Sequence, residues 1–247
     1  ANYSGGEALY RLRHSAAHVL ATAVIELFPG VKVAGGPPIE TGFYYDFARD
    51  EPFTPEDLVR IEARMREIVA EDQPFEYSEA TREEAEARFR TAGEKYKLYF
   101  ITQIPPGSRV TYYRNGPFLD LCRGPHVAST GNIGVFKLTH VAGAYWLGHE
   151  RNEMLQRIYG TAFATQDELD GYLERIAESL RRDHRRLGRE LDLFSVHEEV
   201  GSGLIHWHPR GAMVRHLIEA FWTDEHLKRG YDLVYTPHIA SEKLYEI

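Results

Sequence analysis

The sequence predicts an α+β fold, in which helices and strands are grouped along the chain instead of alternating strictly. Residues 7–28 have the apolar spacing of an amphipathic helix. Short aromatic and β-branched segments then cluster between residues 98 and 146. Two further long helical segments follow, and 247 residues suffice for more than one domain.

The first predicted helix extends from Glu7 to Phe28 and stops at Pro29-Gly30. Its apolar residues recur close to the helical period: Leu9, Leu12, Ala16, Val19, Leu20, Ala23, Val24 and Leu27. Residues 35–38, Gly-Gly-Pro-Pro, predict a turn. Residues 42–47, which include four aromatic side chains, then predict a strand.

Two polar helices are predicted next. The first covers residues 55–72, with Thr54 as its N-cap, Pro55 in the first turn and Asp57 as a stabilising early acid. The second covers residues 81–93, and its many charges favour a solvated face over a binding surface.

The strands expected after these helices supply the sheet of the α+β fold. They cover residues 98–101, 110–114, 118–122, 134–139 and 144–146.

The last third of the chain is predicted to be mainly helical. One long helix is expected from Asp167 to about Arg189 and another, strongly amphipathic, from Ala212 to Arg229. Gly230 is the expected residue after the end of the second helix. Residues 231–236 predict a short strand that leads into Pro237.

Composition narrows the class of protein. No apolar run approaches the length that crosses a bilayer, and the N-terminus has no secretory pattern. The single cysteine, Cys122, excludes an internal disulfide and fits a reducing cytoplasm. A net charge of -8 argues against nucleic-acid binding over the whole surface, although it allows a local basic patch. Because the chain begins without Met and ends in Ser-Glu-Lys-Leu-Tyr-Glu-Ile, we expect a segment of a longer protein.

Two pairs of titratable side chains are the main functional signal. His14 and His18 lie one turn apart on the same face of the first predicted helix, so their imidazoles can converge. Cys122 and His126 flank Gly124-Pro125, which places them on a loop or strand end. Four such groups fit a metal site or a small hydrolytic site. The alternative is structural, because paired helical histidines are often surface or core residues and a lone cysteine is often a small buried hydrophobe.

Several long motifs, in the same order, resemble the bacterial threonyl-tRNA synthetase family over nearly the whole chain. They are Arg-His-Ser-Ala-Ala-His at 13–18, Gly-Phe-Tyr-Tyr-Asp at 42–46, Gly-Glu-Lys-Tyr-Lys at 93–97, Asp-Leu-Cys-Arg-Gly-Pro-His at 120–126, Ala-Gly-Ala-Tyr-Trp at 142–146, Leu-Gln-Arg-Ile-Tyr-Gly-Thr-Ala at 155–162 and Arg-Asp-His-Arg at 182–185.

The resemblance implies a domain layout. Residues 1–168 would be a two-layer editing domain with a mixed or antiparallel sheet, and residues 169–182 a linker helix. Residues 183–247 would be the truncated start of a class II catalytic domain, in which residues 229–237 resemble motif 1, a dimer-interface element. The later motifs are absent, so we expect no aminoacylation; in the family, ATP, Mg and Zn belong to that absent region.

The implied reaction is the removal of serine mischarged onto tRNA(Thr), by hydrolysis of the ester at the tRNA 3′ end. A missing methylene changes binding by only about 1–3 kcal/mol, so a threonine site admits serine and a second site must correct the error. The resemblance implies the catalytic residues Lys97, His14, Cys122, His18 and His126. Tyr45, Asp120 and Arg123 would bind substrate.

The resemblance also suggests individual roles. Lys97 would stabilise charge and position water, and His14 would bind the terminal ribose or relay a proton. Asp120 would anchor the serine ammonium, and Tyr45 would line the wall. His18, Cys122 and His126 would shape the pocket and hold water. Direct attack by water is favoured over a Cys122 nucleophile, because a catalytic thiol needs a lowered pKa and an oriented base.

The resemblance implies a metal-free pocket and no cofactor in this segment. Spacing alone also allows zinc on His14, His18, Cys122 and His126, as in the related alanyl-type editing domains. Two alternative functions therefore stand beside the first: a zinc-dependent alanyl-type trans-editing deacylase, and a non-catalytic tRNA-docking or dimerisation module. The partners implied are serine-charged tRNA(Thr) and, in the full-length enzyme, a second copy, with no membrane. Arg181, Arg182, Arg185 and Arg186 are candidate tRNA-backbone contacts, or else a solvated helix end.

Overall fold

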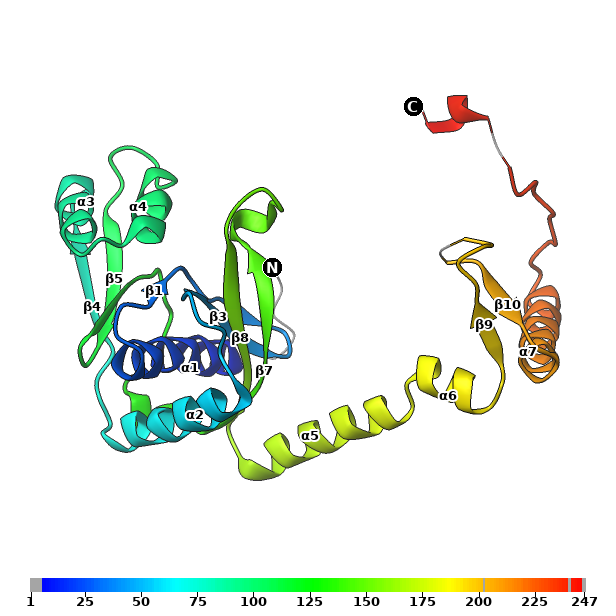
Figure 1. Cartoon of the computed structure of the whole chain (residues 1–247), viewed down its shortest axis with the longest axis horizontal. Helices are drawn as coiled ribbons and strands as arrows, with labels where there is room; N and C mark the ends of the chain where they lie inside the picture. The colour runs from blue at the N-terminus through cyan, green and yellow to red at the C-terminus, as the bar shows by residue number, and fades with distance from the viewer. Residues whose placement is uncertain (1–5, 202, 240, 246–247) are drawn as a thin grey trace. The chain divides into compact units, whose positions relative to one another are not determined.

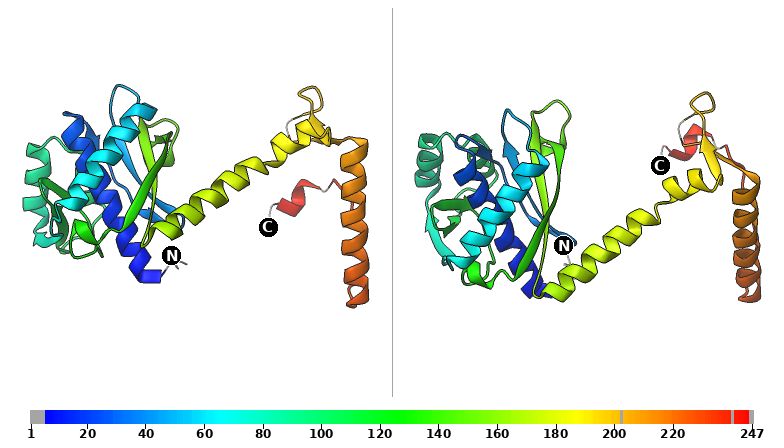
Figure 2. Two further views of the ribbon diagram at one scale, coloured as in Figure 1. Left: turned by 90° about the horizontal axis from the view of Figure 1, so that it is seen from below. Right: turned by 60° about the horizontal axis from the view of Figure 1, so that its bottom comes forward.

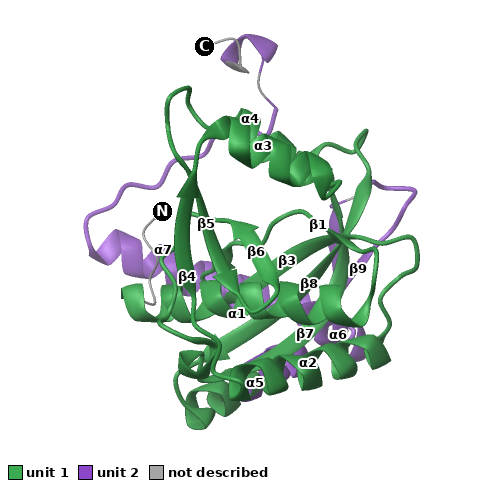
Figure 3. Cartoon of the chain, turned by 90° about the vertical axis from the view of Figure 1, so that its left-hand side faces the viewer, with its two compact units in different colours: residues 1–173 green, residues 174–247 purple. Residues whose placement is uncertain are grey.

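The computed structural model describes residues 6–201, 203–239 and 241–245, and it divides into two compact units. Unit 1 comprises residues 1–173 and unit 2 residues 174–247 (Figure 3). The predicted segments that include residues 1–5 or 246–247 lie partly outside the described residues. No helix in the described part of the chain is long and apolar enough to cross a membrane, as expected from the sequence.

Unit 1 is built on a five-stranded antiparallel sheet with the order β1-β3-β8-β7, in which β2 also pairs with β3 (Figure 1). Its strands are β1 (Lys32–Val33), β2 (Pro38–Ile39), β3 (Gly42–Ala48), β7 (Val135–Tyr145) and β8 (Met154–Phe163). Strand β7 joins the two segments predicted at 134–139 and 144–146, and it continues through a bulge between Leu138 and His140. The predicted α+β class is therefore confirmed, with an antiparallel sheet.

Two helices lie side by side against this sheet (Figures 1 and 2). They are α1 (Gly6–Leu27) and α2 (Pro55–Ala70), and both match the predicted helices within two residues. Thr54 and Asp57 form the expected cap of α2, each side chain accepting from the other residue's backbone N–H. Small residues such as Ala16, Ala17 and Ala21 are fully buried in α1, which lets the helix approach its neighbours closely.

A smaller antiparallel sheet, ordered β4-β5-β6, carries the second half of the site. Its strands are β4 (Glu76–Ala80), β5 (Val110–Asn115) and β6 (Phe118–Leu121). Helices α3 (Arg82–Thr91) and α4 (Lys95–Thr102) lie beside each other in the chain segment between β4 and β5. Thr81 caps α3 in a second capping box with Glu84.

Helix α4 corrects the strand predicted at residues 98–101. The Leu-Tyr-Phe-Ile run has strand-like composition, but Lys97 and Ile101 are buried four residues apart, which is the helical repeat. Ile101 packs in a core with Ala85, Phe89 and Tyr112, so tertiary packing overrides the local β propensity.

Unit 2 departs from its predicted elements at two places. The helix expected over 167–189 is divided into α5 (Gln166–Arg181), which spans the boundary of the units, and α6 (His184–Glu190). Asp183 begins the second helix, because its side chain accepts from the backbone N–H of Arg185 at 2.7 Å. The strand predicted at 231–236 is irregular, since no described segment pairs with it.

The remaining elements of unit 2 are a two-stranded antiparallel sheet and a helix. Strands β9 (Phe194–Val196) and β10 (Ile205–Trp207) precede α7 (Pro209–Lys228), and a short 3-10 turn covers Glu242–Tyr245. Gly230 follows α7 with φ of 82°, as its predicted position after the helix end requires. The strong amphipathicity predicted for this helix is wrong, because its apolar side chains are not gathered on one face, and the large ones among them are exposed.

Candidate functional site

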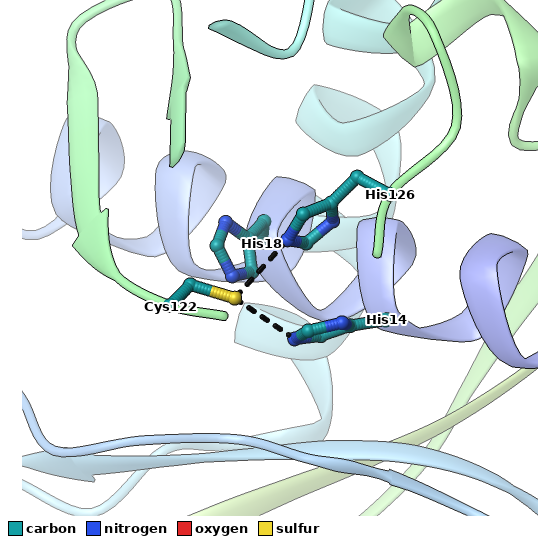
Figure 4. A group of neighbouring side chains, drawn as sticks. All are labelled: His14, His18, Cys122 and His126. Carbon is teal, nitrogen blue, oxygen red and sulfur yellow. Dashed lines mark hydrogen bonds between the residues drawn. The ribbon is translucent and has the colours of Figure 1, made fainter. Parts of the chain in front are cut away.

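The two predicted His and Cys pairs meet at one point in unit 1 (Figure 4). His14 and His18 project from the same face of α1, one turn apart. Cys122 directly follows β6, and His126 lies in the loop that comes next. One ligand atom from each of the four side chains lies within 4.8 Å of the others. The loop or strand-end position expected for the second pair is therefore confirmed.

Cys122 is the centre of this cluster. Its Sγ lies 3.3 Å from Nε2 of His14 and 3.2 Å from Nε2 of His126. The backbone N–H of Gly124 donates to the same sulfur at 3.2 Å. Gly124 has φ of 68°, and a Cβ there would be 2.7 Å from the Tyr113 hydroxyl, so the loop requires glycine.

The hydrogen bonds fix the tautomers of His14 and His126. Nδ1 of His14 lies 3.2 Å from the carbonyl oxygen of Pro125, which can only accept, so Nδ1 carries the proton. Nδ1 of His126 lies 3.1 Å from Oγ of Ser15, whose own hydrogen goes to the carbonyl of Arg11. His126 Nδ1 must therefore donate as well. Both Nε2 atoms consequently present lone pairs toward Cys122 when the rings are neutral.

Burial keeps these groups uncharged. Loss of solvation lowers the pKa of His14, and it lowers those of His18 and His126 further, with the neighbouring imidazoles adding to the effect. Burial, followed by the charge of Asp120, raises the pKa of the Cys122 thiol to about 12. The site therefore holds neutral imidazoles and a thiol, which is not the activated thiolate that covalent catalysis needs.

A second group, of opposite charges, is buried beside the cluster. Lys97 on α4 forms an ion pair with Asp120 on β6 and donates to the Tyr45 hydroxyl at 2.9 Å. The Tyr45 hydroxyl in turn donates to Asp120 at 2.6 Å, and burial raises the pKa of this phenol well above its ordinary value. Asp120 also lies 3.5 Å from Nε2 of His18, so it joins the charged group to the His and Cys cluster.

These residues surround a cavity of about 790 Å³. Its polar lining includes His14, His18, Lys97, Asp120, Cys122 and Arg123. Tyr45, which we expected on the wall, is fully buried behind it, and His126 is likewise absent from the lining. Both side chains therefore support residues of the wall. Tyr45 is hydrogen-bonded to Asp120 and Lys97, and His126 contacts the sulfur of Cys122.

Sequence reasoning missed the aromatic side of the cavity. It is lined by Tyr10, Tyr44, Phe100, Ile104 and Trp146, together with residues 34–37. Gly36 is required there, because a Cβ would be 2.1 Å from the carbonyl oxygen of Tyr44. Ser15 was also missed as a contributor, although its place between the two histidines of α1 was a usable signal. Aromatic and polar side chains in one cavity suit a ligand with one flat and one polar part.

The four candidate tRNA-backbone arginines belong to unit 2, and each already has a carboxylate partner. Arg181 and Arg182 pair with Glu178, Arg185 with Asp183 and Arg186 with Glu190. By contrast, Arg123 lines the cavity of unit 1 and pairs with no carboxylate among the described residues. The ion pairs of the four unit 2 arginines are exposed and therefore weak, so phosphates can replace their carboxylate partners.

Comparison with known proteins identifies close relatives of this chain. A family profile described as "Threonyl and Alanyl tRNA synthetase second additional domain" matches residues 110–159, which include Asp120, Cys122, Arg123 and His126. The chain is 56% identical over 234 residues to a threonine–tRNA ligase of Acidithiobacillus ferrooxidans, covering 95% of this chain and 36% of the relative.

Two further threonine–tRNA ligases give the same result. Identity is 58% over 240 residues with that of Pelobacter propionicus, covering 97% of this chain and 38% of the relative. Identity is 52% over 241 residues with that of Acidobacterium capsulatum, covering 97% and 35%. The chain thus spans a little over a third of the length of these relatives.

Proposed function

The chain belongs, as a segment, to the threonyl-tRNA synthetase family, and on that premise we propose that unit 1 removes serine from mischarged tRNA(Thr) by hydrolysis. The observation that carries the proposal is the cavity that brings neutral imidazoles and a thiol together with a buried Lys97–Asp120 pair. Hydrolysis of an ester needs a positioned water, a proton acceptor and a fixed positive charge near the developing oxyanion.

His14 is the residue best suited to accept the proton of the attacking water. It lines the cavity, and burial keeps its imidazole neutral. The Nδ1–H bond to Pro125 leaves the Nε2 lone pair available and stabilises the ring when it becomes protonated. An alternative role for the same nitrogen is to bind the hydroxyl of the terminal ribose.

Lys97 supplies the positive charge. Its ammonium is held by the Tyr45 hydroxyl and the Asp120 carboxylate, so it is preorganised before substrate arrives. In this assignment the amino group of the esterified serine approaches Asp120 as an additional cation. Asp120 would then face two cations, Lys97 from the protein and the ammonium from the substrate, which places the ester carbonyl close to Lys97.

Cys122 acts in this proposal as a wall and hydrogen-bonding group. Its thiol, with a pKa raised to about 12, is too weakly acidic to serve as the nucleophile near neutral pH. Direct attack by water needs no covalent intermediate. The aromatic wall with Tyr44, Phe100 and Trp146 would receive the terminal adenosine, and the exposed Arg123 would meet a phosphate.

The test measures hydrolysis of three substrates by the purified chain: seryl-tRNA(Thr), threonyl-tRNA(Thr) and seryl-tRNA(Ala). We expect selective loss of serine from tRNA(Thr), and at least a 100-fold slower reaction in the Lys97→Ala variant, the loss typical when one group that stabilises the transition state is removed. Lys95→Ala is the matched control, because Lys95 is an exposed neighbour that pairs with Glu153 at 2.8 Å.

Each of the other outcomes points to a different function. Equal hydrolysis of seryl-tRNA(Ala), dependent on added metal, would favour the alanyl-type deacylase; the description of the matching profile also names alanyl tRNA synthetase. Binding of tRNA without hydrolysis, by a folded protein, would favour the non-catalytic docking module.

A further inference from the structure

The hydrogen of the Cys122 thiol has two acceptors within reach. Nε2 of His126 lies 3.2 Å from the sulfur, and Nε2 of His14 lies 3.3 Å from it (Figure 4). Both nitrogens lack a hydrogen in the tautomers that Ser15 and Pro125 impose. A thiol has one hydrogen, so it can donate to only one of the two imidazoles. The two distances are nearly equal, so the surroundings of each ring decide which imidazole receives it.

The two imidazoles differ in their access to the cavity. His14 lines the cavity, so solvent there can donate to its Nε2. His126 does not line the cavity. Its ring centroid lies 4.9 Å from that of Phe75 and 4.5 Å from that of Tyr113, two side chains that help to enclose it. A buried nitrogen without a donor is costly, so the thiol hydrogen belongs on the side of His126.

Ser15 fixes the tautomer of His126 on which this assignment depends. The Ser15 side chain is buried in α1, and its hydroxyl donates to the carbonyl oxygen of Arg11 at 2.8 Å. The same oxygen accepts from the backbone N–H of Val127 at 3.0 Å and from Nδ1 of His126 at 3.1 Å. One donated and two accepted bonds use the full capacity of a hydroxyl. Nδ1 of His126 therefore keeps its hydrogen, and Nε2 keeps its lone pair.

The opposite tautomer of His126 would reverse the bonds around the sulfur. A hydrogen on Nε2 of His126 would point at Sγ of Cys122, which would then be the acceptor. The thiol hydrogen would turn to Nε2 of His14, the other acceptor within hydrogen-bond distance. His14 could then accept no proton from the attacking water, because its lone pair would already be used.

We propose that Ser15 is a positioning residue of this site: it holds His126 as the Nδ1–H tautomer and so keeps Nε2 of His14 free as the base. The thiol of Cys122 links the two imidazoles by donating to His126. In the reaction, the water oxygen bonds to the ester carbonyl carbon and its proton passes to Nε2 of His14. That proton leaves with the ribose oxygen when the ester C–O bond breaks. The role in catalysis rests on the proposed function, whereas the tautomer assignment does not.

The tautomer is tested by nitrogen-15 NMR of the imidazole side chains in the whole chain. The signals of His126 are identified by their loss in His126→Gln. We expect the Nδ1–H tautomer in the unmodified chain. In Ser15→Ala, Nδ1 loses its acceptor, so we expect the Nε2–H tautomer, bonded to the sulfur of Cys122. An Nε2–H tautomer in the unmodified chain, or an Nδ1–H tautomer retained in Ser15→Ala, would overturn the proposal.

Hydrolysis of seryl-tRNA(Thr) tests the consequence for the reaction. Ser15→Ala should lower kcat about 100-fold, the lower end of what a general base contributes. KM should change little, because Ser15 does not line the cavity. A raised KM with unchanged kcat would overturn the positioning role. If the unmodified chain has the expected tautomer but hydrolyses none of the three substrates, the proposed function fails and the tautomer assignment stands.

Thr22→Val is the matched control. Thr22 is also fully buried in α1, and its hydroxyl donates to the backbone carbonyl of His18, four residues earlier, at 2.9 Å. It accepts from Nδ2 of Asn115 at 2.9 Å, so the substitution removes a comparable hydroxyl that bonds to no imidazole nitrogen. Denaturant titration should show similar losses of stability in the two variants, while only Ser15→Ala changes the tautomer and kcat. An equal loss of kcat in Thr22→Val would show a purely structural effect and overturn the positioning role.

Discussion

Helices α1 and α7 have similar lengths and many apolar residues, yet their surroundings differ completely. Leu20 on α1 is 0% exposed, whereas Leu217 on α7 is 60% exposed. Helix α1 packs against α2 and strands of the larger sheet, which surround its middle turns. Comparable composition thus produces a buried helix in unit 1 and an exposed one in unit 2, because burial depends on what packs against the helix.

The polar clusters of the two units differ in burial in the same way. In unit 2, Ser195, His208 and Asp192 are joined by bonds of 2.8 and 2.6 Å, a spacing that would suit a catalytic triad. The Asp192 side chain, however, is 80% exposed, whereas that of Asp120 in unit 1 is 5% exposed. Hydrogen-bond distances alone do not make a reactive site. Exclusion of water is also needed, because it strengthens the interactions between charges and shifts the pKa values of buried groups.

The largest expected effect comes from breaking the buried ion pair. Lys97→Ala leaves Asp120 buried without its cation, which should lower the free energy of unfolding of unit 1 by about 3–5 kcal/mol and abolish hydrolysis. Lys95→Ala, which breaks an exposed pair, should change stability by about 0.5 kcal/mol or less. Denaturant titration followed by circular dichroism measures both; equal effects would contradict the contrast between buried and exposed pairs.

A matched pair of leucines tests the packing difference directly. Leu20→Ala should destabilise unit 1 by about 2–5 kcal/mol, because it opens a cavity in a close-packed core. Leu217→Ala on α7 should change stability by about 0.5 kcal/mol or less. Hydrogen exchange measured by mass spectrometry assigns each effect to its unit, and a large loss of protection from Leu217→Ala would show that this face of α7 is packed in solution.

Acidification should destabilise unit 1 through its three buried imidazoles. Their pKa values are lowered below 6.5, so the unfolded chain binds more protons than the folded one when the pH falls below about 6.5. Stability should then decrease by up to about 1.4 kcal/mol per pH unit for each of these groups. Unfolding titrations between pH 7 and pH 5 test this, and His126→Gln should have a shallower pH slope than the unmodified chain.

The smallest expected effect concerns the paired arginines of unit 2. If Arg185 and Arg186 contact tRNA phosphates, replacing both by Gln should make tRNA binding less sensitive to salt. The slope of the logarithm of the binding constant against the logarithm of the salt concentration should decrease in magnitude by up to about 0.9 per lost contact. The double substitution Arg60→Gln and Arg66→Gln, two exposed arginines on α2, is the control. An unchanged slope would mean that these arginines do not contact tRNA and only form the solvated start of a helix.

The sequence by itself determined features that depend on near neighbours in the chain. Capping boxes at Thr54 and Thr81, the glycine after α7 and the shared face of His14 and His18 all follow from local geometry. The resemblance identified the family from ordered motifs. Local propensity failed where packing or pairing decides, as in α4, whose residues have strand-like composition, and at residues 231–236, which have no strand partner among the described residues.

Only the tertiary structure decided how the site is built. Sequence spacing could not show that β6 and its following loop meet α1, or that Lys97 neutralises Asp120 while Tyr45 supports both from behind the wall. The protonation of His14 and His126 depends on Pro125 and Ser15, acceptors brought to the rings by folding. These properties arise from contacts between residues 23 to 111 positions apart in the chain, which no local pattern encodes.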